Sequence, residues 1–261
     1  MRIGFFDSGI GGVSVAKTFI RNNPSFSYLY FADDAHMPYG ERSPDEVFAL
    51  TTHALTRMFE HSCTLVILAC NSASTVLPRI QQEWLPAHFP GKKVLGIIRP
   101  TAEDIAMHAH EHEVYILATP ITVASRAYDK ELAKINQVAH FFEIACPKLA
   151  EVIEKSENYL SDAQVSHYCK LYTQPIPYDK PIYVYTACTH YAWAAQLLQQ
   201  ERPLAKLIHQ SSIIADTLSA YLSRHTEISQ ALIQPAELSF EVQCSSEDKQ
   251  YIQKLLNLFT I

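Results

Sequence analysis

The sequence predicts an α/β protein made of two similar doubly wound domains with mostly parallel sheets. Short apolar, β-branched or aromatic runs alternate along the chain with longer segments of helical periodicity. Parallel strands need crossover connections, and helices between the strands supply them. In addition, two strand ends about half a chain apart carry nearly the same residues, which indicates an internal repeat.

The alternation of apolar runs and helical segments gives the expected elements in chain order. Strands are expected at Arg2–Phe6, Ser27–Phe31, Thr64–Ala69, Lys93–Ile98, Val114–Ala118, His140–Ala145, Ile182–Thr186 and Glu237–Cys244. Helices are expected near 12–22, 44–61, 72–85, 100–110, 121–135, 147–156, 161–173, 191–201 and 246–259.

The internal repeat suggests how the chain divides. Residues 68–72 (LACNS) and 186–190 (TACTH) each end a buried strand with Ala-Cys followed by polar residues, and segments 3–8 and 116–122 are both strands that run into a small-residue turn and a helix. We therefore expect two α/β units that face each other. Residues 1–97 and 208–261 would form the first, with the Asp7-Ser8 loop and Cys70, and residues 98–207 the second, with Cys188.

Composition excludes several classes of protein. The chain has 261 residues, of which 48% are hydrophobic, so it can bury a sizeable core. It has 21 Lys and Arg against 27 Asp and Glu, a formal net charge of -6. General binding to nucleic acid or to an anionic membrane is therefore not expected.

The cysteines and histidines predict neither a disulfide scaffold nor a metal site. The six cysteines include no C-x2-4-C pair. Residues 108–112 (HAHEH) alternate histidine along a predicted helix end, and residues two apart do not share a helix face, so we interpret them as solvated surface. The N-terminus lacks a signal-peptide pattern and no apolar stretch is long enough to span a membrane. We expect a cytoplasmic protein with free thiols.

A glycine-rich loop follows the first strand at residues 7–14 (DSGIGGVS). It lacks the third glycine of a dinucleotide site and the Gly-Lys-Ser/Thr of a P-loop, and Asp7 would repel phosphate. Asp7 fits an ammonium group better, while Ser8 and the loop amides fit a carboxylate. The alternative is a tight strand-to-helix turn whose glycines serve steric needs.

Two thiols are the strongest candidates for chemistry. Cys70 and Cys188 each follow a buried strand, where ligands bind in open α/β sheets, and Asn71 or Ser72 and Thr189 are candidate N-caps of the helices that follow. A helix N-terminus favours the thiolate. A buried cysteine taken alone is more often a small hydrophobe, but two in matching contexts favour function.

Two reactions fit these thiols. Cys188 and His190 form a Cys-His pair that could support acyl transfer, as in thiol hydrolases, but this leaves Cys70 without a role. Two thiols on opposed half-sites fit stereoinversion of a carbon, because one base can remove a proton while the other donates one to the opposite face. Weaker candidates are Tyr39 with Gly40 in a turn, and the hydroxyls of Thr119 and Thr122, which could bind a carboxylate or cap a helix.

Four motifs in order resemble the glutamate racemase family of the aspartate/glutamate racemase superfamily. They are residues 7–12 (DSGIGG), 38–40 (PYG), 69–74 (ACNSAS) and 188–191 (CTHY), and they span most of the chain. The resemblance implies two α/β domains with the active site in the cleft between them. It also implies cofactor-independent interconversion of L- and D-glutamate, which supplies D-glutamate for bacterial peptidoglycan. Glutamate would be the small-molecule partner, and family members are often homodimers.

The resemblance also assigns roles to residues of this chain. Cys70 and Cys188 match the two catalytic bases, Asp7 and His190 the groups that assist them, and Glu154 an auxiliary acidic group. The positions matching the substrate contacts are Asp7, Ser8, Tyr39, Gly40, Asn71, Ser72, Thr189 and His190.

Some positions depart from the family pattern. Thr186-Ala187 replaces Leu-Gly before the second cysteine, Ala192 replaces Pro, and His36 stands where Arg is common. Both bases remain in place, so the departures concern rate and substrate fine structure. The alternatives are a racemase of aspartate or another small acidic amino acid, the Cys188–His190 thiol hydrolase, and a non-catalytic amino-acid-binding protein.

Overall fold

The computed structural model describes residues 1–109, 112–135, 141–233 and 238–260. Three expectations fall partly outside these ranges. They concern His110 at the end of the helix expected at 100–110, His140 at the start of an expected strand, and Glu237 at the start of the last strand.

The first sheet has five parallel strands in the order β4-β3-β1-β2-β9. Their bounds are β1 Arg2–Asp7, β2 Tyr28–Ala32, β3 Cys63–Leu68, β4 Lys93–Gly96 and β9 Phe240–Cys244. The inner strands are buried on both faces, which is why they read as nearly continuous apolar runs in the sequence.

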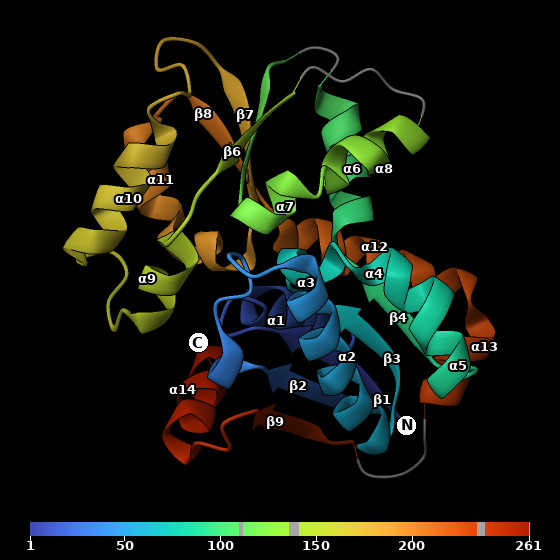
Figure 1. Cartoon of the computed structure of the whole chain (residues 1–261). Helices are drawn as coiled ribbons and strands as arrows, with labels where there is room; N and C mark the ends of the chain where they lie inside the picture. The colour runs from blue at the N-terminus through green and yellow to red at the C-terminus, as the bar shows by residue number, and fades with distance from the viewer. Residues whose placement is uncertain (110–111, 136–140, 234–237, 261) are drawn as a thin grey trace.

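The second sheet repeats this order. It contains β5 Val114–Ala118, β6 Phe141–Ala145, β7 Ile182–Ala187 and β8 Ala205–His209, all parallel, in the order β6-β5-β7-β8. Read from the other edge, β8-β7-β5-β6 matches β4-β3-β1-β2. The predicted internal repeat is therefore confirmed, as is the prediction of two parallel-sheet α/β domains (Figure 1).

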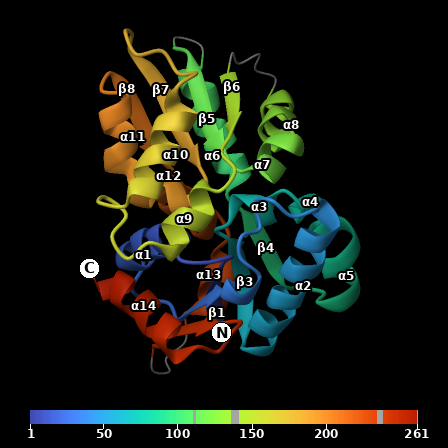
Figure 2. The ribbon, with the colours of Figure 1, turned by 60° about the vertical axis from the view of Figure 1, so that its left-hand side comes forward.

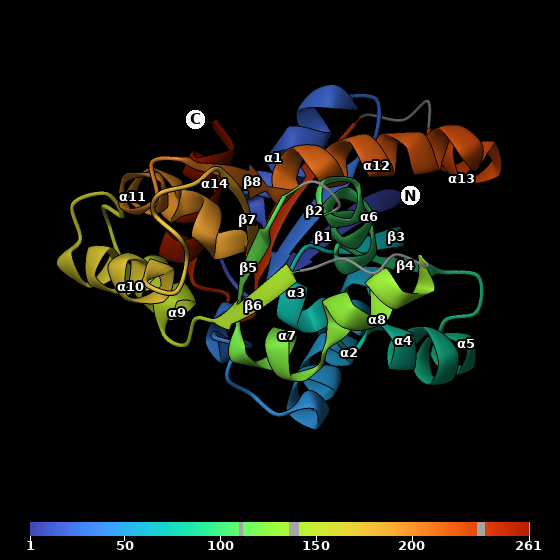
Figure 3. The ribbon, with the colours of Figure 1, turned by 90° about the horizontal axis from the view of Figure 1, so that it is seen from above.

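Helices cover both faces of each sheet, as seen from different sides in Figures 2 and 3. In the first domain α1 Val13–Asn22, α12 Gln210–Arg224 and α14 Lys249–Thr260 cover one face, and α2 Pro44–Glu60 and α5 Leu85–His88 the other. In the second domain α9 Leu149–Lys155, α10 Ala163–Thr173 and α11 Ala195–Glu201 lie opposite α6 Ile98–His108 and α8 Ala127–Lys134.

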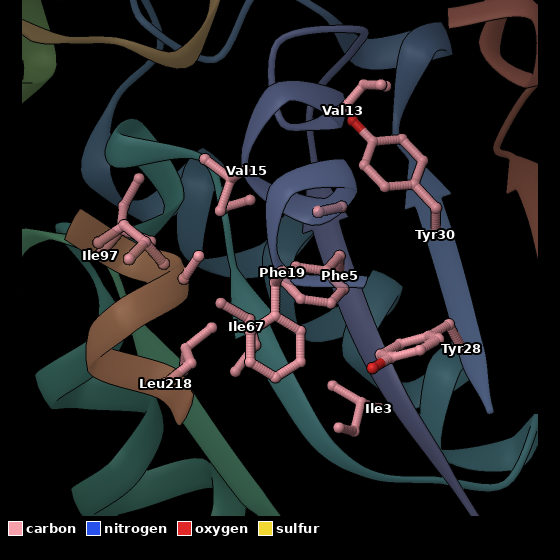
Figure 4. Packing of buried hydrophobic residues seen from close by; sticks show 14 of the residues in the cluster. Ile3, Phe5, Val13, Val15, Phe19, Tyr28, Tyr30, Ile67, Ile97 and Leu218 are labelled. Carbon is pink, nitrogen blue, oxygen red and sulfur yellow. The ribbon is translucent and has the colours of Figure 1, made fainter. Parts of the chain in front are cut away.

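Apolar residues that recur at strand and helix spacing in the sequence pack together to form the core. Phe5 of β1 and Phe19 of α1 pack with ring centroids 5.7 Å apart, and Tyr28 of β2 meets Phe19 edge-on at 6.2 Å (Figure 4). Local signals start the helices at fixed residues. Ser43 forms a capping box with Glu46 at the start of α2, and the Asp162 side chain caps α10.

Each predicted strand is present, with ends that differ by at most three residues from the prediction. Three helices that were predicted as single elements are wrong, because the structure divides each of them into shorter pieces. Residues 72–85 form α3 Asn71–Ser74, α4 Leu77–Arg79 and a π-turn Ile80–Trp84, because Pro78 cannot donate to the carbonyl four residues earlier. Residues 121–135 divide into α7 Pro120–Ala124 and α8, since Arg126 is left-handed at φ 53°. Residues 189–194 form a 3-10 helix before α11. A further 3-10 turn spans Asp34–His36.

Besides the Asp34–His36 turn and most of α5, three elements were not predicted, namely β8, α12 and α13 Thr226–Leu232. The spacing of Ile214, Leu218 and Leu222, all buried on α12, is a helical signal that could have found that helix. α12 packs against α1 and α6 and runs along the junction of the two domains (Figure 1). Because it contacts both, the expected boundaries at 97/98 and 207/208 stay a prediction. Among the described residues, no helix is both long enough and apolar enough to cross a membrane.

Candidate functional site

Both thiols occupy the position next to the strand-order switch of their sheet. Cys70 lies two residues after the end of β3, beside β1, and Cys188 directly follows β7, beside β5. Ligands of open α/β sheets bind at this place, beyond the carboxyl ends of the strands. The two residues are only 5% and 6% exposed, and their neighbours in sequence meet, because Thr189, next to Cys188, donates to Asp7, next to the Ser8 hydroxyl that contacts Cys70.

The expectation that Asn71, Ser72 or Thr189 caps the following helix is wrong. The N-cap positions are occupied by Cys70 and Cys188 themselves, without a side-chain cap hydrogen bond. The polar side chains after each cysteine instead make contacts across the domain interface, as described below.

Cys70 lies against the Asp7-Ser8 end of β1. The Ser8 hydroxyl is 3.8 Å from the Cys70 sulfur. Burial, followed by the negative charge of Asp7, raises the pKa of the Cys70 thiol to about 12. This environment favours the protonated thiol at neutral pH.

Cys188 lies against a buried histidine–carboxylate pair. His190 Nδ1 is 4.0 Å from the Cys188 sulfur, and His190 Nε2 is 2.6 Å from Glu154 Oε2. Burial disfavours the imidazolium, but hydrogen bonds with Cys188 and Glu154 outweigh it and raise the pKa of His190. Burial would raise the pKa of Glu154, yet its bonds with His190, Tyr251 and the Ile10 amide lower it. The pair is therefore ionised at neutral pH.

Asp7 connects the Cys70 side to the Cys188 side. Its Oδ1 accepts from the Gly9 amide at 2.9 Å, and its Oδ2 accepts from the Thr189 hydroxyl of the second domain at 2.9 Å. Asp7 is fully buried, which raises its pKa, and His190 and these two donors oppose the rise. A carboxylate thus lies between the two thiol environments.

The glycine loop brings the two domains into contact. The Ile10 amide donates to Glu154 Oε2 at 2.9 Å and the Gly9 amide donates to Asp7 Oδ1, so these two amides bind carboxylates of the protein itself, and the expectation that the loop amides hold a ligand carboxylate stays a prediction. A Cβ on Gly9 would lie 2.2 Å from Glu154 Oε2, and one on Gly11 would lie 2.5 Å from His190 Nδ1. These positions need glycine because the second domain approaches the backbone closely.

Asn71 belongs to a buried amide network. Its Nδ2 donates to Gln210 Oε1 at 2.6 Å, and its Oδ1 accepts from Tyr128 at 2.8 Å and from Gln210 at 3.2 Å. Gln210 Nε2 also donates to Thr101 at 2.8 Å. This network of hydrogen bonds holds Asn71, the residue next to Cys70, against α6, α8 and α12.

A chain of hydroxyls crosses the interface beside Cys70. Ser72 Oγ lies 3.0 Å from Thr119 Oγ1, which lies 2.9 Å from Thr122 Oγ1. The expected Tyr39-Gly40 turn meets this chain, because a Cβ on Gly40 would lie 2.7 Å from Thr119 and the Gly40 carbonyl accepts from the Ile121 amide.

Tyr39 is buried, and its hydroxyl donates to Asp33 Oδ2 at 2.5 Å. His36, where the family pattern has Arg, contacts the other oxygen of Asp33 at 2.8 Å. The structure thus brings the predicted residues into one region, where contacts across the interface join the two domains.

Several residues of this region were not predicted from the sequence. Gln210 and Tyr128 contact Asn71, Asp33 contacts Tyr39, and Tyr251 of α14 donates to Glu154, while Thr101 joins the network through Gln210. Asp33 carried a local signal, since Asp33-Asp34 precedes the turn at 38–40. The others come from distant segments and had no local signal. Within the described ranges, no group of three or more His, Cys, Asp or Glu is placed to hold a metal ion.

Comparison with known proteins identifies the family. The chain matches the Asp/Glu/Hydantoin racemase family over residues 14–208. It is 36% identical to the glutamate racemase of Ruegeria pomeroyi, with 86% of each chain covered, and 37% identical to that of a Caulobacter species, with 87% of each covered.

The glutamate racemase isoform RacE1 of Bacillus anthracis has the same fold. Its crystal structure superposes with a TM-score of 0.84 at 24% identity, over 99% of this chain and 93% of that one. The match over more than half of the chain, together with relatives above 30% identity, shows that this protein belongs to the Asp/Glu/hydantoin racemase family. The resemblance stated from its four motifs is confirmed.

Proposed function

We propose that this protein interconverts L- and D-glutamate without a cofactor, with Cys70 and Cys188 as the two bases. The observation that carries the proposal is the matched placement of two buried thiols at equivalent strand ends, each beside a polar group. The relatives above 30% identity are named glutamate racemases, which supports glutamate as the substrate.

The reaction is two proton transfers. A thiolate removes the α-proton, so that an S–H bond forms while the C–H electron pair stays on carbon. The opposing thiol then protonates the planar carbon from the other face and becomes the thiolate. The raised pKa of Cys70 suits it to be the resting proton donor. The ionised His190 next to Cys188 complements negative charge on that sulfur.

Asp7, His190 and Glu154 assist these transfers. Asp7 is placed to hold the substrate ammonium, since its buried carboxyl group directly precedes Ser8, whose hydroxyl is 3.8 Å from the Cys70 sulfur. His190 assists Cys188, and Glu154 keeps the imidazole charged and oriented. In a site closed to water, these fixed charges and dipoles stabilise the charge that develops on the substrate.

The hydroxyls and amides near the thiols would bind the two substrate carboxylates. The set comprises Ser8, Tyr39, Gly40, Asn71, Ser72, Thr119, Thr122, Thr189 and His190. Since the chain carries net charge -6, binding must depend on such local donors rather than on overall attraction. The two-thiol mechanism requires no Schiff base, so we propose a reaction without pyridoxal phosphate.

The same resemblance leads to three further proposals. The product serves peptidoglycan synthesis, the enzyme works in the cytoplasm, and it forms a homodimer without nucleic-acid or membrane partners. The reducing cytoplasm suits the chemistry because an oxidised thiol could neither accept nor donate the proton. Analytical ultracentrifugation tests the dimer directly.

Proton exchange with solvent tests the main proposal. L- or D-glutamate is incubated in deuterated water, and deuterium at the α-carbon is followed together with circular dichroism. We expect exchange and racemisation in the wild type and a loss of about 10²-fold or more in Cys70→Ser and in Cys188→Ser. Cys169→Ala, a buried cysteine of α10, is the matched control and should stay within about threefold.

The outcomes separate the alternatives. Near wild-type racemisation by either serine variant contradicts the two-thiol mechanism. Exchange with aspartate but not glutamate indicates an aspartate racemase. An acyl-enzyme burst that survives loss of Cys70 indicates a hydrolase, and glutamate binding without exchange indicates a binding protein.

A further inference from the structure

The C-terminal helix reaches a residue of the candidate site. The Tyr251 hydroxyl of α14 donates to Glu154 Oε1 at 2.6 Å, and Lys254 Nζ donates to the Glu154 backbone carbonyl at 3.0 Å. Figures 1 and 2 show α14 next to α9, which carries Glu154, although the two helices belong to different domains. The Tyr251 hydroxyl is therefore hydrogen-bonded directly to the carboxylate of the Glu154–His190 pair.

The core of the first domain holds α14 in place. Leu255 is fully buried in the cluster that covers the first sheet, and Ile252, Leu256 and Phe259 pack against that cluster. The Phe259 ring meets Tyr30 edge-on at 5.3 Å, and the Tyr30 hydroxyl bonds to the carbonyl of Gly9 in the glycine loop. The Tyr251 side chain thus projects from a fixed base that also supports the loop.

Glu154 needs both of its oxygens satisfied to keep one orientation. Oε2 accepts from His190 and from the Ile10 amide, and Oε1 accepts from Tyr251. Glu154 is 6% exposed, so a carboxylate oxygen without a donor would be costly there. The other titratable groups that face it are Asp7, Tyr30 and Tyr159, whose negative forms repel its charge, while the Lys254 ammonium lies at its backbone.

We propose that Tyr251 is a positioning residue of the reaction, which orients Glu154 and through it the His190 imidazole beside Cys188. Helix α14 of the first domain thereby contributes a residue to the acid–base groups that assist Cys188 of the second domain. This inference rests on the proposed racemisation, and it adds a residue to which neither the family motifs nor the sequence pattern assigned a role.

Two single variants separate positioning from packing. Tyr251→Phe removes the hydroxyl and keeps the ring, whereas Lys254→Met removes the other bond between α14 and Glu154 without touching the carboxylate. We expect kcat to fall about 10- to 100-fold in Tyr251→Phe, as for loss of a hydrogen bond to a charged group, with KM changed less than about threefold. Lys254→Met should stay within about twofold of the wild type.

The pH profile gives a readout that packing alone does not move. The Tyr251 hydroxyl stabilises the ionised form of Glu154, so its loss raises the pKa of that carboxyl. The acidic limb of the kcat profile should therefore move to higher pH in Tyr251→Phe and stay in place in Lys254→Met. The two enantiomers of glutamate have equal free energy, so kcat/KM must fall by the same factor for the L-to-D and the D-to-L reaction. Agreement between the two values is a consistency check on the measurements.

A double-mutant cycle decides whether the effect passes through Glu154. In a Glu154→Gln background, Tyr251→Phe should cause no further change in the pH profile and less than about a threefold change in kcat. An unshifted acidic limb in Tyr251→Phe, an equal loss in Lys254→Met, or fully additive effects in the cycle would each overturn the proposal.

A second measurement is independent of the reaction. The histidine nitrogen signals of His190 report protonation of its carboxylate partner, and the acid midpoint that they report should rise in Tyr251→Phe. If the wild type does not racemise glutamate, the proposed function fails while this titration still tests the contact. An unchanged midpoint in Tyr251→Phe overturns the inference even when racemisation is present.

Discussion

Asn71 and Gln210 exchange two hydrogen bonds through their side-chain amides, although 139 residues separate them in sequence. Asn71 follows the first candidate base, and Gln210 begins the helix that runs along the domain junction. Tyr128 and Thr101 of the second domain complete the network. The backbone that carries Cys70 is therefore fixed by both domains at once.

Gln210→Met should weaken this network while keeping the side-chain volume. It leaves Asn71 Nδ2 without its buried acceptor and removes the bond to Thr101, whose hydroxyl still donates to the Ile97 carbonyl, and the loss costs about 1–3 kcal/mol of unfolding free energy. Urea unfolding followed by circular dichroism measures the cost. Gln250→Met, at an exposed position of α14, is the control and should stay within about 0.5 kcal/mol. Equal stability of the two variants would show that the network contributes nothing.

Gly11→Ala should separate the two domains at the candidate site. The new Cβ would lie 2.5 Å from both His190 Nδ1 and Thr189 Oγ1 and 2.8 Å from the His190 backbone nitrogen, so a rotamer change alone cannot relieve the clash. We expect about 1–3 kcal/mol of destabilisation and at least a tenfold loss of racemisation.

Gly91→Ala is the control for loss of a glycine as such. Gly91 has φ 88° and no atom near the position of a Cβ, so its substitution strains the backbone without a clash. It should lower the melting temperature and leave racemisation within about twofold of the wild type. Normal activity in Gly11→Ala would contradict the conclusion that the second domain must approach the backbone of the glycine loop closely.

Thr119→Val should affect substrate binding more than catalysis. The substitution keeps the shape of the side chain and removes the hydroxyl that joins Ser72 to Thr122. If this chain binds a substrate carboxylate, KM for glutamate rises about tenfold, in line with the loss of one charged hydrogen bond. Ser125→Ala, whose hydroxyl bonds only to the Thr122 carbonyl among its described contacts, should leave KM unchanged. A normal KM in Thr119→Val would exclude that role.

The placement of the two thiols at strand ends could be predicted from the sequence because the signals for it are local. An apolar run that ends in Ala-Cys places each cysteine at a strand end, and the repeated topology follows from the same alternation of elements. Glu154 entered through the family resemblance, since nothing in its own helix distinguishes it. Gln210 and Tyr251 could not be predicted, because their roles depend on contacts between segments far apart in sequence. The caps expected at Asn71 and Thr189 were wrong for the same reason: partners across the interface compete for those side chains.

Glu143 of β6 provides a test of pH-dependent stability away from the candidate site. Its Oε1 is buried and has no hydrogen-bond partner among the described residues. Burial, followed by the charge of Asp129, raises its pKa from the usual 4.5 to about 7, while Arg126 opposes the rise. The folded state therefore favours the neutral carboxyl. Below about pH 4.5 both folded and unfolded chains hold the proton, and the penalty develops between pH 4.5 and 7 as the unfolded chain alone becomes ionised.

Glu143→Gln should consequently stabilise the protein only at higher pH. At pH 8 the variant avoids the cost of a buried charge, and we expect a gain of about 1–2 kcal/mol, less than the whole shift implies because the side chain is partly exposed. At pH 4 the gain should vanish, since the wild-type carboxyl is then neutral in both states. Urea unfolding at the two pH values measures the difference, and Glu157→Gln, an exposed glutamate of the same domain, should show no such dependence. A gain of equal size at pH 4 and pH 8 would mean that shape or packing, and not ionisation of Glu143, limits stability at this position.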